Sequence, residues 1–86
     1  MIIYLYVNVF VSYRNEELSV ISYKPFYDTL LKKNTTEYEL IFKQGISANT
    51  IHRMKHGEAI TTKTLDTLCF ILDCSVSDII EYVKPE

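Results

Sequence analysis

The sequence predicts a mainly α-helical domain of five helices with short β-strands at its N- and C-termini. Apolar residues recur at helical spacing from residue 26 onward, and capping residues and glycines separate these stretches. The first thirteen residues are instead rich in β-branched and aromatic side chains, which favour strands. A chain of 86 residues has room for one such domain.

The composition is typical of a folded protein without membrane or redox chemistry. The chain is 48% apolar and 23% charged, with two glycines and two prolines. The apolar N-terminus is shorter than the roughly 20 residues of a membrane helix. It also lacks the basic region and cleavage site of a signal peptide. Cys69 and Cys74 have no disulfide-type spacing and are expected to be structural thiols, with a redox pair or metal site as the alternative. We therefore expect a cytoplasmic protein.

The N-terminal segment is expected to be separate from the helices. Residues 2–13 predict a strand, residues 14–17 a polar turn and residues 18–23 a second strand, so that the two strands form a hairpin. The domain boundaries follow as a strand-like extension over residues 1–19 and a helical domain over residues 20–86.

The first two helices are predicted from proline, capping and glycine positions. Pro25 suits the first turn of a helix that runs to about Lys33. Thr36 and Glu39 form the T-x-x-E pattern of a capping box at the start of the second helix. Gly45 can adopt the positive φ that ends a helix.

The last three helices carry similar signals. Ser47 caps a helix from Ala48 to about His56, with Ile51 and Met54 facing inward. Thr61 caps a fourth helix, whose apolar stripe ends at Leu72. Residues 75 and 78 make a capping pair for a short fifth helix, and residues 81–84 predict a last strand.

Charge is distributed unevenly along the chain. The formal net charge is −2, yet residues 43–63 carry +3, and residues 64–86 carry −4. The first of these segments holds Lys43, Arg53, Lys55 and Lys63 against Glu58. This asymmetry predicts one surface that faces phosphates and another that faces away from them.

The stretch from Thr36 to Met54 has the pattern of a helix-turn-helix: two capped helices joined by a glycine turn. The second of these helices keeps one polar face free, and a free helix fits the major groove of DNA. Its outward residues suit that contact, because Asn can bond to adenine, Arg to guanine and a small methyl to thymine. Ser47, Thr50 and Lys55 also suit phosphates.

Three segments of the chain resemble the Cro and lambda-repressor family in its compact bacterial form. They are ISYKPFYDTLL, TEYELIFKQGISANTIHRMKHGE and TTKTLDTLCFILDCSVSDIIEYV. The resemblance implies a five-helix domain that binds a palindromic operator as a two-fold dimer. The base contacts that it implies are Ser47, Ala48, Asn49, Thr50 and Arg53. The backbone contacts that it implies are Thr36, Lys43, Lys55 and His56.

Two positions depart from the family pattern. Glu37 stands where many members have a Gln that meets a phosphate, and an acid there would repel the phosphate. Ile41 stands where a small Ala is usual, which alters the packing of the second and third helices.

Relatives also commonly begin at the position of Val20, with M-I-S-Y-K-P, which suggests the hypothesis that residues 1–19 are leader translated from a misassigned start. The rival interpretation is a native strand that extends the sheet or a dimer interface.

The predicted function is a sequence-specific transcriptional regulator, a repressor, with helix 48–56 in the major groove of double-stranded DNA. We expect a homodimer, no catalysis, no cofactor and no membrane association. His52 and His56 have the spacing of a two-His metal site but no third ligand nearby, so phosphate contact is favoured over metal binding. The alternative function is an antitoxin or protein-interaction module with a protein partner, which keeps the fold without tight DNA binding.

Overall fold

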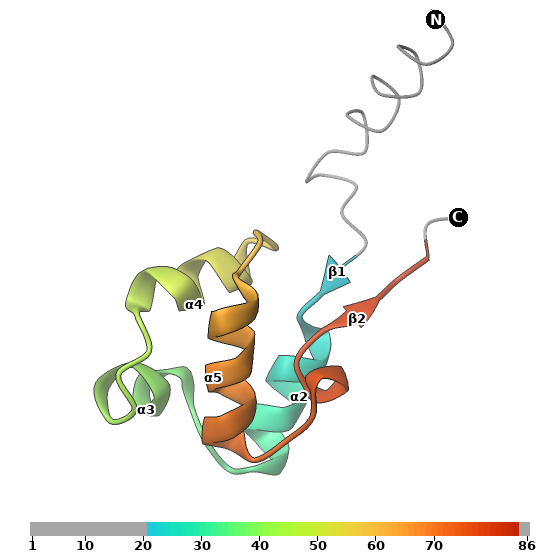
Figure 1. Ribbon diagram of the computed structural model, residues 1–86. Helices are drawn as coiled ribbons and strands as arrows, with labels where there is room; N and C mark the ends of the chain where they lie inside the picture. The colour runs from blue at the N-terminus through green and yellow to red at the C-terminus, as the bar shows by residue number, and fades with distance from the viewer. Residues whose placement is uncertain (1–20, 85–86) are drawn as a thin grey trace, which may run out of the picture.

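The computed structural model describes residues 21–84. The elements follow in the order β1 (Ile21–Ser22), α2 (Lys24–Lys32), α3 (Glu37–Phe42), α4 (Ala48–Lys55), α5 (Thr62–Leu72), η2 (Val76–Asp78) and β2 (Glu81–Tyr82) (Figure 1). The strand expected over residues 2–13, the start of the second strand and the leader hypothesis lie outside the described residues.

The four α-helices begin and end close to the predicted residues. Pro25 lies in the first turn of α2, and Asn34 after it has a φ of 55°. Ser47 and Thr61 each accept backbone N–H hydrogen bonds at the start of α4 and α5. The first turns of these helices are therefore fixed by local chemistry that the sequence already contains.

The expectation of five helices is wrong for the described residues, because the fifth is only the three-residue 3₁₀ turn η2. Thr29 on α2 donates a hydrogen bond of 2.8 Å to the carbonyl oxygen of Asp78, which ties the end of this turn to α2. The buried side chain of Ile79 then directs the chain toward β2. Tertiary contacts thus override a local helix signal here.

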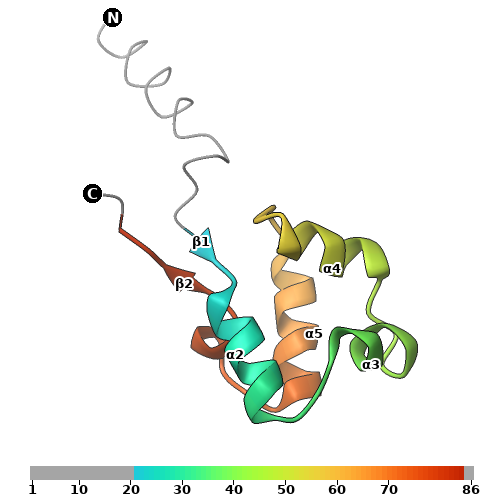
Figure 2. The ribbon, with the colours of Figure 1, turned by 180° about the vertical axis from the view of Figure 1, so that it is seen from behind.

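The two short strands join the ends of the described chain. They pair antiparallel, with Ile21 opposite Tyr82 and Ser22 opposite Glu81. In Figures 1 and 2 they lie beside α2, on the opposite side from α3. The hairpin prediction assigned Ile21–Ser22 a partner in the preceding segment, whereas the structure pairs these residues with the C-terminal strand.

Each of the four α-helices contributes at least one fully buried large side chain to the core. Phe26, Leu40, Met54 and Leu68 are fully buried on α2, α3, α4 and α5, and Ile79 follows η2. Burying an apolar side chain of this size stabilises the folded state by about 1.5–3 kcal/mol. The core therefore holds α4 by its inner face and leaves its other face at the surface.

Within residues 21–84, no helix has the length and apolar character needed to cross a membrane.

Candidate nucleic-acid interface

The turn between α3 and α4 is defined by two capping motifs and one glycine. At the start of α3, the Glu39 N–H donates to the Thr36 hydroxyl (3.1 Å), and the Thr36 N–H donates to Glu39 Oε1 (3.2 Å). Gly45 has a φ of 80°, which suits a residue without a Cβ. Ile46 is buried after the turn, and its N–H donates to the Leu40 carbonyl (2.9 Å). These bonds set the position of α4 relative to α3.

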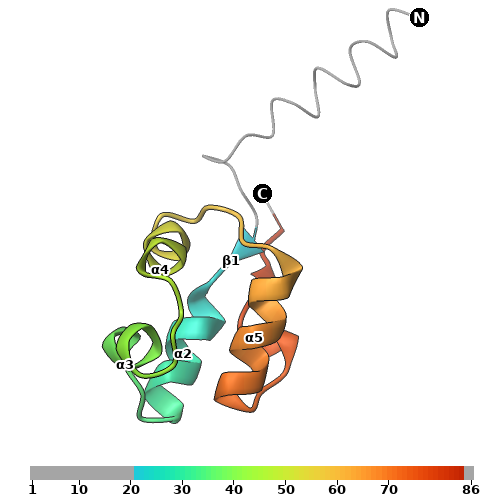
Figure 3. The ribbon, with the colours of Figure 1, turned by 60° about the vertical axis from the view of Figure 1, so that its left-hand side comes forward.

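Helix α4 exposes one face along its whole length. The Ser47 hydroxyl accepts from the N–H groups of Asn49 (3.1 Å) and Thr50 (3.4 Å). Ile51 and Met54 are buried, so the opposite face is turned outward. Figures 1 and 3 show α4 at the edge of the helical body, beside α3 and near the N-terminal end of α5.

The residues predicted to contact bases line this outer face to different degrees. Ser47, Ala48 and Asn49 are exposed, whereas Thr50 is half-buried. Arg53 is also half-buried, and its Nε atom is buried without a hydrogen-bond partner among the described residues. Asn49 is therefore freely accessible to a ligand, and Arg53 has less freedom to move toward one.

The residues predicted to contact the DNA backbone are all exposed, but each already has an intramolecular partner. Lys55 Nζ lies 3.1 Å from Glu37 Oε1, and Lys43 Nζ lies 3.7 Å from Glu39 Oε2. Thr36 is bonded to Glu39 in the capping box. The His56 Nδ1 atom lies 2.8 Å from the His52 carbonyl oxygen. Two of the cations that would meet phosphates are thus partly neutralised by acids of α3.

Glu37 has a partner that the sequence did not reveal. It was predicted to repel a phosphate, and the structure shows that it also pairs with Lys55 across the turn. Its Oε2 atom and the Tyr27 hydroxyl are both buried, and the carboxylate lies close enough to interact with this hydroxyl. Burial and the neighbouring Glu37 carboxylate raise the pKa of Tyr27, so this hydroxyl stays protonated. No local spacing rule relates residues 37 and 55, which is why the pair was missed.

Tyr23 fixes the segment that follows α4. This side chain was predicted to pack in a strand, but it is buried before α2, and its hydroxyl donates to the Glu58 carbonyl oxygen at 2.6 Å. Burial raises the pKa of Tyr23. The chain turns after α4 at Gly57, which has a φ of 72°. The bond from Tyr23 to the next residue, Glu58, then connects this turn to the residue that precedes α2.

The capped helices, the glycine turn and the exposed second helix define a helix-turn-helix domain. The sequence profile of the Cro/C1-type HTH DNA-binding domain matches residues 29–85. The chain therefore belongs to the Cro/C1-type helix-turn-helix family, as its resemblance to Cro and lambda repressor implied.

Solved structures agree with this assignment. The chain is similar to the crystal structure of the transcriptional regulator VanUg, with 26% sequence identity and a TM-score of 0.69. The match covers 76% of this chain and 87% of that one. A search of curated proteins found no match.

Proposed function

We propose that this protein is a sequence-specific DNA-binding transcriptional regulator that places α4 in the major groove. The observation that carries the proposal is the outer face of α4, which is polar, contains no acid and begins with the exposed residues Ser47, Ala48 and Asn49. An amide such as Asn49 can form the paired bonds that distinguish adenine, and the Ala48 methyl can contact thymine. The regulator VanUg, which shares the fold, supports a role in transcription.

Phosphate contacts would hold α4 in position. Thr36, Lys43, Lys55 and His56 are exposed on α3 and α4 and can contact the backbone on the two sides of the groove. Lys43 can exchange its acidic partner for a phosphate, because exposed ion pairs contribute only about 0–1 kcal/mol. Lys55 can do the same at a greater cost, because its partner Glu37 is half-buried. Binding would then depend strongly on salt. Occupation of an operator by such a domain is enough to repress transcription, and this role places the protein in the cytoplasm with the DNA.

A homodimer would double this interface on a palindromic operator. Helix α5 and turn η2 leave Phe70 85% exposed and Val76 50% exposed. Exposed apolar side chains of this size are typical of protein interfaces when they lie together. We propose that Phe70, the more exposed of the two, contributes to the dimer contact.

The test is selection of binding sites from random and genomic DNA by the purified full-length protein. A recurrent motif with a dyad is expected. Arg53→Ala should then weaken binding to the selected motif by about 1–3 kcal/mol while changing the affinity for unrelated DNA much less. Selection that returns no motif would refute the proposal, and an unchanged motif affinity would remove Arg53 from the bases that are read.

One observation favours a second function, a protein-interaction module or antitoxin. The pairing of Lys55 with Glu37 and of Lys43 with Glu39 reduces the positive charge that DNA would meet. In that case the outer face of α4 would bind a protein partner. Binding to DNA would be weak and would depend little on salt. The selection experiment separates the two functions directly.

A further inference from the structure

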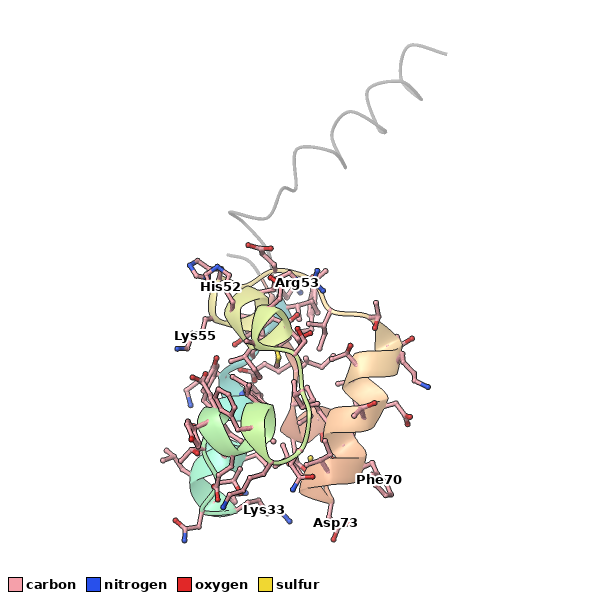
Figure 4. All side chains as sticks on the ribbon, turned by 90° about the vertical axis from the view of Figure 1, so that its left-hand side faces the viewer. Lys33, His52, Arg53, Lys55, Phe70 and Asp73 are labelled. Carbon is pink, nitrogen blue, oxygen red and sulfur yellow. The ribbon has the colours of Figure 1, made fainter. Side chains whose placement is uncertain are left out.

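Two histidines occupy neighbouring turns on the outer face of α4. His52 and His56 are both exposed, and their ring centroids lie 4.3 Å apart with an interplanar angle of 44°. Figure 4 shows the His52 side chain pointing away from the body of the protein. The two imidazoles are therefore close enough to act on one ligand, and their surface is open to solvent.

A hydrogen bond to the backbone selects the tautomer of one ring. The His56 Nδ1 atom lies 2.8 Å from the His52 carbonyl oxygen. A carbonyl oxygen can only accept, so Nδ1 must carry the hydrogen, and the neutral ring then keeps a free lone pair on Nε2. Histidines that bind metals are commonly held in this way, with the second ring nitrogen donating to a carbonyl or carboxylate.

We propose that His52 and His56 together bind one divalent transition-metal ion, with Nε2 as the ligand atom of His56. Imidazole nitrogens suit Zn²⁺, Ni²⁺ and Cu²⁺, whereas Mg²⁺ and Ca²⁺ prefer oxygen ligands. Within residues 21–84, no cluster of three or more His, Cys, Asp or Glu side chains is arranged to hold a metal. Water or an external anion would therefore supply the remaining ligands.

The surrounding charges make this an exchangeable site. Arg53 and Lys55 lie on the same helix and disfavour a dication, although Glu37 partly neutralises Lys55. With two protein ligands and two nearby cations, the ion would bind reversibly, and the fold would not depend on it. The two half-buried thiols, Cys69 and Cys74, lie on and after α5 and are the competing ligands in the chain.

The experiment is titration of the full-length, untagged protein with ZnCl₂, without DNA. Calorimetry should show one saturable site per chain, and imidazole resonances should shift for both rings. The assignment is simple because the chain contains only two histidines. His52→Asn and His56→Asn should each abolish this binding, with helical content unchanged by circular dichroism, because both side chains are exposed.

The matched control is the double variant Cys69→Ser and Cys74→Ser, which should keep the zinc isotherm and both imidazole shifts. Zinc binding that survives in either histidine variant, or that disappears with the cysteines, would overturn the proposal. Absence of saturable binding to the unaltered protein would overturn it too. None of these outcomes depends on whether the protein binds DNA.

Discussion

Replacing Glu37 with Gln should strengthen DNA binding, which is unusual for a substitution in an interface. Glu37 Oε1 lies 3.1 Å from Lys55 Nζ, and the other carboxylate oxygen of Glu37 is buried near the Tyr27 hydroxyl. The substitution removes an acid that repels phosphate and competes with it for Lys55. Family members with Gln at this position use that amide to contact a phosphate, as the resemblance implies.

The size of the effect follows from counterion release. Each phosphate neutralised on duplex DNA contributes a slope of about −0.9 to the dependence of log affinity on log salt. Because Glu37 competes with phosphate for Lys55, its removal should steepen the slope by up to about 0.9, which is a further loss in affinity of up to about 3.5-fold for each fourfold rise in salt. The effect on the free energy of unfolding should stay within about 1 kcal/mol. Loss of a partly exposed ion pair costs little, and replacing a partly desolvated acid with a neutral amide offsets some of that cost.

The assay is fluorescence anisotropy with the selected operator at several salt concentrations. Asp73→Asn is the matched control, because it makes the same change in charge at the end of α5. Figure 4 shows Asp73 at the opposite end of the protein from His52, Arg53 and Lys55. Lys55→Ala should flatten the slope for every DNA sequence. Equal slopes for Glu37→Gln and the unaltered protein would refute the reasoning, as would weaker binding by the variant.

Gly45→Val should destabilise the domain by at least about 1–2 kcal/mol, because the left-handed backbone disfavours any side chain. A Cβ at this position would meet nothing within 4 Å, so Gly45→Asn, which tolerates positive φ, should restore most of the loss in thermal melts. Hydrogen bonds from the backbone and hydroxyl of Ser75 lower the pKa of Asp78. Its stabilising contribution is present above the ordinary aspartate pKa and is lost as pH falls through the lowered value. Asp78→Asn should therefore lose less stability than the parent protein in acid titrations followed by circular dichroism. Phe70→Ser should convert the proposed dimer to a monomer by light scattering while leaving the fold intact, and an unchanged mass would exclude this surface from the dimer contact.

Local chemistry in the sequence determined the helix-turn-helix. The Thr36 and Ser47 caps, the glycine at residue 45 and the inward positions of Ile51 and Met54 were all predicted, and each is confirmed. These features depend on residues within a few positions of each other, which is the range over which capping and backbone preferences act. Exposure of Ser47, Ala48 and Asn49 then follows from helical periodicity.

Only the tertiary structure decided the features that join distant residues. The predicted fifth helix is a 3₁₀ turn whose end is bonded to Thr29 on α2, and Ile21–Ser22 pairs with a strand at the other end of the domain. The pairing of Glu37 with Lys55 sets the charge that the outer surface presents. Contacts of this kind depend on how the helices pack around a shared core, and no periodicity or spacing along the chain records that packing.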